Sequence, residues 1–264
     1  IQVSTESAYD QTVALGWYGG KNIPNLLVGY SNYENSAEVK SFVKRIRVQQ
    51  DQVMVEEQVA ETEFSIGPMS MSDYDNDGDL DLFVGGRSIP GRYPEAASSK
   101  LYRNEGGVFT LDQDNSQQFE FIGMVSGSVF SDLDGDGDGD LILAVEWGPV
   151  MIFRNNNGQF TDVTEALGMD KYRGLWNGVT TGDIDGDGKL DIIATNWGLN
   201  NEYPASMENP LRLYYDDFDN NGTLDIIESH FNPMSNQVVP VRGLATLFQA
   251  IPYIRSRIPN HDRF

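Results

Sequence analysis

Short apolar blocks recur along the chain, and the clearest of them begin directly after clusters of acidic residues. These blocks follow Asp81, Asp140, Asp191 and Asp225 and contain two to five consecutive apolar side chains. Runs of this length between turn-forming residues are typical of buried strands. The segment before the second cluster, GMVSGSVFS at 123–131, alternates in part between apolar and small residues. Each unit therefore predicts a strand, an acidic turn and a second, buried strand.

Two further strands are predicted in the second unit. The segment VMIFRNNNG at 150–158 ends in Asn and Gly, and QFTDVT at 159–164 makes a short fourth strand. The segment KLYRNEGGVFTL at 100–111 repeats this pattern in the preceding unit. Short strands rich in β-branched and aromatic residues, separated by Gly and Asn, are typical of all-β folds. Four strands per unit predict a β-propeller of four-stranded blades.

The acidic clusters are four copies of one motif. They fit D-x-D-x-[DN]-G-x-x-D over residues 73–81, 132–140, 183–191 and 217–225, and their starts lie 34 to 59 residues apart. They are named loops 1 to 4 here, with positions numbered 1 to 9. Repeats of this spacing suit propeller blades. A fainter copy near 17–25 keeps the apolar half but lacks acids, so we expect a blade without a metal there.

The spacing of the acids indicates a calcium site in each loop. Calcium takes six to eight oxygen ligands at about 2.3–2.6 Å, whereas Mg²⁺ prefers tighter octahedral geometry with fewer protein ligands. Side chains at positions 1, 3, 5 and 9 supply oxygens, and position 7 supplies its backbone carbonyl, since its side chain varies. Position 6 is Gly in all four copies, where the chain must turn sharply. We predict up to four Ca²⁺ ions, with these ligand residues: Asp73, Asp75, Asp77, Asp79, Asp81, Asp132, Asp134, Asp136, Asp138, Asp140, Asp183, Asp185, Asp187, Lys189, Asp191, Asp217, Asp219, Asn221, Thr223 and Asp225.

The loops resemble the FG-GAP/VCBS repeats of integrin α-subunit propellers and of many bacterial surface proteins. The segments LYRNEGGVFT at 101–110 and MIFRNNNGQFTDVTEALGM at 151–169 are similar to the bacterial cartilage-acidic-protein-like, ASPIC/UnbV-associated branch. The resemblance covers roughly residues 60–230. It implies a seven-bladed propeller, for which this chain is too short alone. It also implies an extracellular or bacterial outer-membrane surface protein, often a lipoprotein with further domains, and it does not imply an enzyme.

Composition narrows the range of partners. With 40 acidic against 18 basic residues, the net charge of −22 argues against nucleic acid binding. The absence of cysteine excludes disulfides and thiolate chemistry. No apolar run reaches the length of about 18 residues expected of a membrane span, and no signal segment follows Ile1, so we expect a targeting signal outside this segment. The expected partners are other protein subunits of a surface assembly, or glycans.

No catalytic residue is predicted. The two histidines lie in no nucleophile motif, and metal ligation accounts for the paired carboxylates. The alternative is a carbohydrate-active enzyme, because some polysaccharide lyases are calcium-bearing propellers. A groove lined by Lys, Arg, Tyr and His near a calcium would favour that alternative. A purely structural subunit of a larger assembly is a third interpretation.

Two tryptophans suggest a ligand surface. Trp147 and Trp197 occupy matching places at the ends of second strands, beside Glu146 and Asn196, with Asn200 close by in the sequence. An aromatic plane next to polar groups suits the binding of a sugar. The competing interpretation, which the pattern favours slightly, is that each indole packs between blades.

Residues 243–258 break the β pattern. Apolar side chains recur there at helical spacing, at Leu244, Leu247, Phe248 and Ile251. Pro252 limits the helix to a short one. We predict a helical insertion packed on the propeller; with Arg255 and Arg257 it could instead contact a membrane or a partner.

Overall fold

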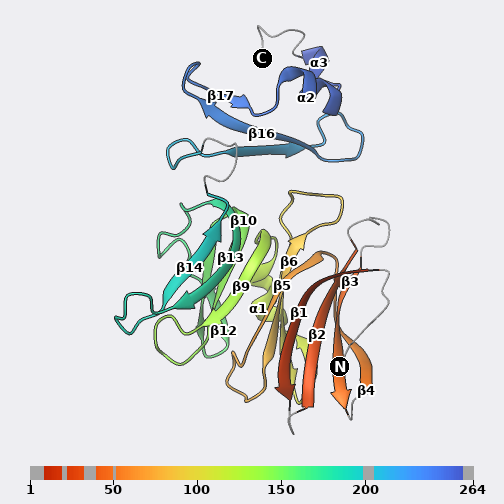
Figure 1. Cartoon of the computed structure of the whole chain (residues 1–264), viewed down its shortest axis with the longest axis vertical. Coiled ribbons are helices and arrows are strands. Elements are labelled where there is room, and N and C mark those ends of the chain that lie inside the picture. Colours follow the sequence, from red (N-terminus) through yellow and green to blue (C-terminus); the bar gives the residue numbers. More distant parts are fainter. Residues whose placement is uncertain (1–8, 20–22, 33–39, 50–51, 199–204, 258–264) are drawn as a thin grey trace. The chain divides into compact units, whose positions relative to one another are not determined.

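The computed structural model describes residues 9–19, 23–32, 40–49, 52–198 and 205–257. The chain divides into two compact units. The first unit consists of residues 1–90 and 95–196, and the second of residues 91–94 and 197–264. Each unit has its own sheets, labelled in Figure 1.

The first two sheets of the first unit are four-stranded antiparallel meanders (Figure 1). Each strand pairs with the next one along the chain, which is the strand order of a propeller blade. The first sheet contains β1 (Asp10–Gly19), β2 (Ile23–Ser31), β3 (Ser41–Gln49) and β4 (Gln52–Thr62). The second contains β5 (Ser65–Ser72), β6 (Asp81–Ser88), β7 (Lys100–Glu105) and β8 (Val108–Leu111).

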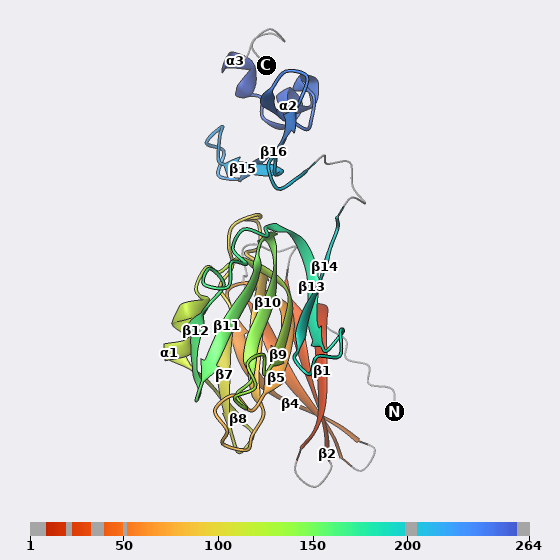
Figure 2. The same cartoon turned by 90° about the vertical axis from the view of Figure 1, so that its left-hand side faces the viewer.

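The third sheet is a meander with a two-stranded extension (Figure 2). Its strands are β9 (Met124–Ser131), β10 (Asp140–Gly148), β11 (Val150–Asn156) and β12 (Gln159–Asp162). The end of β10 also pairs with β13 (Gly174–Gly182), which pairs with β14 (Asp191–Asn196). The repeat that contains loop 3 thus has two strands among the described residues where four were predicted. The next strand along the chain pairs instead within the repeat that contains loop 4.

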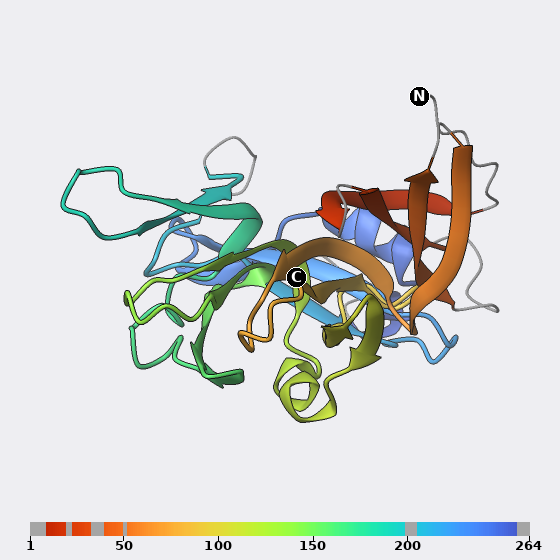
Figure 3. The same ribbon diagram turned by 90° about the horizontal axis from the view of Figure 1, so that it is seen from below.

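The prediction of a buried second strand fails for β14 (Asp191–Asn196) and β16 (Asp225–Asn232), most of whose residues are half-buried or exposed because fewer elements pack on them. The second strands β6 and β10 are buried on both faces, because alternate side chains contact different sheets. Leu82 packs into the cluster that contains Leu27 and Val43 of the first sheet. Phe83, the next residue, packs instead into the cluster that contains Leu141 of the third sheet. The sheets, seen from below in Figure 3, therefore pack face against face. Burial on both sides explains why these strands read as continuous apolar runs.

The first strands of successive repeats approach closely through small residues. A Cβ atom on Gly127 of β9 would lie 2.7 Å from the Cα of Gly178 of β13, so no larger residue fits. The hydroxyls of Ser70 and Ser128 form a 2.9 Å hydrogen bond between β5 and β9. Short side chains therefore set the spacing between neighbouring blades along their first strands.

A short helical segment after β8 was not predicted from the sequence. It consists of α1 (Gln113–Ser116) and the 3₁₀ turn η2 (Gln117–Phe119). Asp112 caps α1, since its side chain accepts the backbone N–H of Asn115 at 3.1 Å. Phe119 is fully buried and contacts the rings of Phe83 and Phe153. Four residues are too few for a helical period to show, and the acidic cap was the available signal.

The second unit has a three-stranded antiparallel sheet and two helices. The strands are β15 (Arg212–Asp216), β16 (Asp225–Asn232) and β17 (Gln237–Pro240). Helices α2 (Leu244–Ala250) and α3 (Ile254–Arg257) lie within the segment predicted to be helical, whose last residue, 258, is outside the described part. Leu244, Leu247 and Ile251 are buried. None of the helices in the described ranges has the length and apolar character needed to span a bilayer.

The prediction of an all-β fold with four-stranded, blade-like sheets is confirmed. The closed, seven-bladed ring remains a prediction.

Candidate metal centres

All four loops join strands in the same register. In each loop, the residue before position 1 pairs with the residue at position 9, so position 9 begins the second strand. The four pairs are Ser72 with Asp81, Ser131 with Asp140, Gly182 with Asp191, and Asp216 with Asp225. The repeated motif therefore gives one loop geometry in four copies.

The carboxylate at position 1 holds the turn together. In loop 2, Asp132 Oδ1 accepts the N–H of Gly135 at 2.8 Å, and Oδ2 accepts the N–H of Gly137 at 3.0 Å. The position 6 glycine makes this bond in every loop, at 2.9–3.0 Å. Gly137 has a φ of +97°, which L side chains rarely adopt, and the other position 6 glycines also have positive φ. The prediction that position 6 requires Gly thus has a direct conformational reason.

The carboxylate at position 9 accepts the backbone N–H of position 2 in every loop, at 2.9–3.2 Å. Asp81 and Asp140 are 0% and 2% exposed, and each also accepts an N–H from the third strand of its blade. Burial raises the pKa of Asp81 to about 7 and raises the pKa of Asp140. A nearby dication would favour the charged form of both groups, so their placement suits a cation site.

Three carboxylates converge in each loop. One oxygen from each member lies within 4.8 Å of the others, a separation that one ion bound at about 2.3–2.6 Å from each oxygen can span. The groups use positions 1, 3 and 9 in loops 1, 3 and 4, and positions 1, 3 and 5 in loop 2. They are Asp73, Asp75 and Asp81; Asp132, Asp134 and Asp136; Asp183, Asp185 and Asp191; and Asp217, Asp219 and Asp225.

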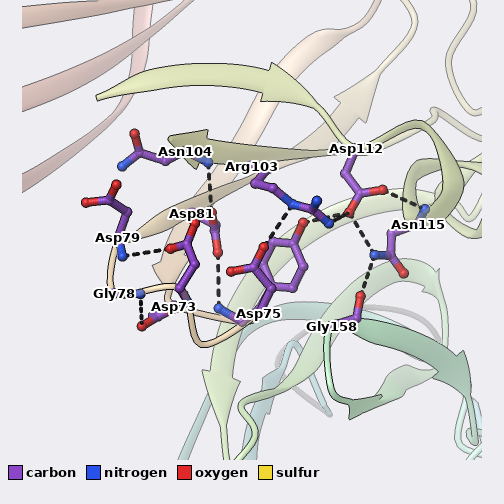
Figure 4. A network of polar contacts seen from close by, with 12 residues as sticks. Asp73, Asp75, Gly78, Asp79, Asp81, Arg103, Asn104, Asp112, Asn115 and Gly158 are labelled. Atoms are coloured by element: carbon purple, nitrogen blue, oxygen red, sulfur yellow. Dashed lines mark hydrogen bonds and ion pairs between the residues drawn. The ribbon is translucent and has the colours of Figure 1, made fainter. Parts of the chain in front are cut away.

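Loop 1 contains a carboxylate oxygen that has no protein partner (Figure 4). Asp75 Oδ1 is buried and accepts no hydrogen bond, while Oδ2 lies 2.8 Å from Arg103 Nε. Burial, and next the charge of Asp77, raise the pKa of Asp75. Buried polar atoms are nearly always satisfied, so a free oxygen within a carboxylate triad fits a cation ligand.

Two arginines beside the loops were missed from the sequence. Arg103 on β7 contacts position 3 of loop 1, and Arg154 on β11 contacts Asp134 at position 3 of loop 2, at 3.0 Å. Each guanidinium partly offsets the negative charge of its loop. The repeated Arg-Asn pair in LYRNE and MIFRNN was the available signal, because it recurs at the same place in two blades.

The asparagine after each arginine anchors the loop to its blade. Asn104 donates its backbone N–H to Asp81 at 2.8 Å (Figure 4). It also donates its side-chain N–H to the carbonyl of Leu80 at 2.9 Å. Its side-chain oxygen accepts the N–H of Gly107 at 2.8 Å. Asn155 makes the equivalent bonds in the third sheet, at 2.9, 3.3 and 2.9 Å. The third strand therefore fixes the carboxylate at position 9.

Side chains at positions 5 and 7 have roles within the loops. The position 5 side chain accepts the N–H of position 7 in all four loops, at 2.8–2.9 Å, and these residues are Asp77, Asp136, Asp187 and Asn221. The carboxylates of Asp79 and Asp138 at position 7 each accept a backbone N–H from a neighbouring turn at 2.7 Å. Lys189 and Thr223 at the same position are exposed. These contacts involve the N–H and the side chain of position 7 and not its carbonyl, so the carbonyl's role as a calcium ligand stays a prediction.

Two of the predicted ligand residues, Glu146 and Asn196, lie at the same end of the third sheet. The neighbouring residues Leu175 and Trp176 of β13 pair with Glu146 and with Asn196, respectively. Glu146 and Trp147 lie on β10, where Glu146 forms an ion pair with Arg87 and Trp147 is half-buried with a φ of +62°. Asn196 ends β14. Trp197 belongs to the second unit and is 53% exposed, which does not fit a packed role for this indole. The remaining predicted residue, Asn200, lies outside the described part of the chain.

Comparison with known proteins agrees with the loop geometry. Residues 73–143 and 132–194 each match the FG-GAP-like repeat family. The chain is also 31% identical over 130 residues to cartilage acidic protein 1 of Mus musculus. That alignment covers 46% of this chain and 18% of the length of the relative.

Proposed function

Since the chain carries FG-GAP-like repeats, we propose that it is a calcium-stabilised β-propeller segment that serves as a non-catalytic binding or scaffold module outside the cytoplasm. The observation that carries this proposal is the repetition of one triad geometry in four loops, together with the unpartnered Asp75 oxygen in loop 1. An all-oxygen donor set of carboxylates and carbonyls suits Ca²⁺ better than Mg²⁺ or a softer metal.

Calcium would be held at positions 1, 3 and 9, or 1, 3 and 5 in loop 2, with the position 7 carbonyl as a further ligand. The ion would supply positive charge to a turn that otherwise concentrates carboxylates. Outside the cytoplasm, calcium modules bind with Kd values of about 10⁻⁴–10⁻³ M. We place the chain at the cell surface, in an assembly with other protein subunits or glycans, by its resemblance to surface repeat proteins.

Calorimetric titration of the metal-free protein tests the calcium assignment. We expect several sites that bind Ca²⁺ in the submillimolar to millimolar range, and weaker binding in an Asp134→Ala variant, which loses one ligand of loop 2. Absence of heat and of any fluorescence change up to about 10 mM Ca²⁺, well above the expected Kd values of about 10⁻⁴–10⁻³ M, would overturn the assignment.

A lyase-like activity is the alternative function, and one observation weighs against it at loop 1. Tyr74 and Arg103 lie beside this loop, but Tyr74 is 0% exposed and its hydroxyl donates to Asp112 at 2.6 Å. Burial raises the pKa of the Tyr74 phenol, so it is not poised to act as a base at neutral pH. Release of unsaturated products from anionic polysaccharides by the calcium-loaded protein would revive the alternative.

For ligand recognition, we propose Trp147 and Trp197 as separate contact points. The left-handed backbone of Trp147 supports this, because unusual backbone at a bulky residue often marks a functional position. The exposure of Trp197 supports it as well. A glycan array probed with the wild type and with Trp147→Phe and Trp197→Phe variants tests each residue in turn. Wild-type binding that either change removes supports the proposal, and a blank array for the folded wild type rejects it.

A further inference from the structure

We propose that loops 1 and 2 form one coupled pair, in which calcium bound at either loop strengthens binding at the other. The inference rests on the proposed calcium binding and concerns how the two sites communicate. It follows from three contacts that join loop 1 to loop 2 or to the turn beside it.

The first contact is a direct side-chain bond between the loops. Asn76, at position 4 of loop 1, donates from Nδ2 to Asp138 Oδ1 of loop 2 at 2.8 Å. The backbone N–H of Asp138 donates in turn to Asp136 Oδ1 at 2.9 Å. Asp136 belongs to the carboxylate triad of loop 2. A change in loop 1 can therefore reach a candidate ligand of loop 2 through two hydrogen bonds.

The second contact is buried. Asn155 is 0% exposed and donates from Nδ2 to the carbonyl of Tyr74, at position 2 of loop 1, at 2.8 Å. The backbone N–H of Asn155 donates to Asp140, at position 9 of loop 2, at 2.9 Å. The N–H of Tyr74 donates to Asp81, at position 9 of loop 1, at 3.1 Å. Asn155 thus links Asp140, which closes loop 2, to Tyr74, whose N–H is bonded to the residue that closes loop 1.

The third contact is packing between loop 1 and the turn from β11 to β12. A Cβ atom on Gly158 in this turn would lie 3.1 Å from the Cβ of Asp75, and the Tyr74 ring packs on Phe160 with ring centroids 5.5 Å apart. The same turn is tied to loop 2, because Asn157 donates its N–H to Asp138 at 2.7 Å. Loop 1 cannot rearrange without moving a turn that is bonded to loop 2.

The coupling is expected to be positive because an ion at one loop also orders part of the other. An ion that orders loop 1 also fixes Asn76, Tyr74 and the adjoining turn, so loop 2 loses less conformational entropy when its own ion binds. Electrostatics act in the opposite direction, since the first dication weakens the negative field felt by the second. Salt screens that effect, with a Debye length of about 3 Å at 1 M. The positive coupling should therefore be clearest at high ionic strength.

Loop 3 provides an internal comparison. Position 4 of loop 2 is Gly135, which has no side chain to reach loop 3 as Asn76 reaches loop 2. Loop 3 also has Lys189 at position 7, where loop 2 has the acceptor Asp138. The coupling should thus affect loops 1 and 2 more than loop 3.

The test follows each loop separately in the full chain. Selective ¹⁵N-glycine labelling gives NMR signals for Gly78, Gly137 and Gly188, whose amides donate to position 1 of loops 1, 2 and 3. Calcium is titrated at 1 M KCl into the wild type and into an Asp75→Asn variant, which weakens loop 1. We expect the calcium midpoint of Gly137 to rise by about fivefold or more, the lower end of typical coupling, while that of Gly188 stays nearly constant.

A second variant removes only the direct link. Asn76→Gly keeps all triad carboxylates, and Gly is compatible with the φ of +60° at this position. It should raise the Gly137 midpoint in the same direction by a smaller factor. The matched control is Asn220→Gly in loop 4, which makes the same change at a position with a φ of +58° and should leave Gly137 unaffected.

The outcomes separate the two proposals. Calcium responses at all three glycines with an unchanged or lower Gly137 midpoint in both loop 1 variants would overturn the coupling and leave calcium binding intact. An equal rise at Gly137 and Gly188 would also overturn it, because the effect would then be general. If no glycine of the wild type responds to calcium, the proposed function itself fails.

Discussion

At the scale of single residues, the glycine at position 6 carries a specific conformational demand. Gly137 has a φ of +97° and open space where a Cβ would lie, so a substitution there meets backbone strain and no steric clash. Gly137→Ala should lower the free energy of unfolding by about 1–2 kcal/mol, the cost of a left-handed L residue. Urea denaturation of the metal-free protein measures it. Gly182→Ala, also in open space but without a positive φ, should change stability by much less.

Also at this scale, the buried carboxylate of Asp81 predicts an unusual pH dependence. Its pKa is raised to about 7 in the folded, metal-free protein, above the value of about 3.9 expected when unfolded. The folded state therefore binds more protons between these two values, and this contribution to stability is lost as pH rises through about 7. In EDTA, stability should fall between pH 5 and pH 8.

Calcium should remove this dependence, because a bound dication holds the carboxylate charged in the folded state. Thermal melts across the same pH range, with and without calcium, provide the measurement. An Asp81→Ala variant should show a shallower slope in EDTA. A slope in EDTA that is identical in the wild type and the variant would show that other groups are responsible.

At the scale of elements, the end of β11 and the turn that follows it connect a blade to loops 1 and 2. Asn155→Ala would leave the carbonyls of Tyr74 and Gly139 and the N–H of Gly158 without their partner. Each unsatisfied buried group costs about 1–3 kcal/mol, so we expect a loss of roughly 3 kcal/mol or more. Asn156→Ala, an exposed neighbour in the same strand, should be nearly neutral. Comparable losses in both variants would contradict the role given to Asn155.

At the scale of the whole molecule, calcium should contribute a large share of stability. Each site with a Kd near 10⁻⁴ M adds about 1.4 kcal/mol at ~1 mM calcium, so four sites add at most about 5–6 kcal/mol. That is comparable with the net stability of a domain, about 5–15 kcal/mol. EDTA should lower the melting temperature markedly, and Asp134→Ala should reproduce part of the loss.

The net charge of −22 lowers the stability of the metal-free protein, because acidic groups repel one another in the compact state. Added KCl should therefore partly restore the melting temperature in EDTA and have less effect in calcium. A melting curve that EDTA leaves unchanged would show that the loops are ordinary turns.

The sequence alone determined the features that arise from local pattern. The four acidic loops, the glycine at position 6 and the apolar strand after each loop could be read from the residues, because a tight turn and a buried strand impose requirements on neighbours in the chain. The buried face of α2 and of the residue that follows it was also readable from the spacing of Leu244, Leu247 and Ile251. Such requirements act over a few residues and leave a visible period.

Only the tertiary structure decided the features that depend on distant parts of the chain. Arg103 lies 28 residues after Asp75, and Asn155 lies 81 residues after Tyr74, yet each pair is in contact. The pairing of β13 with the end of β10, and the pairing of β15 with β16 that leaves only two described strands in the repeat of loop 3, likewise depend on which strands meet in space. Contacts of this kind leave no local period, because the folding of sheets against one another, and not the order of residues along one strand, brings the partners together.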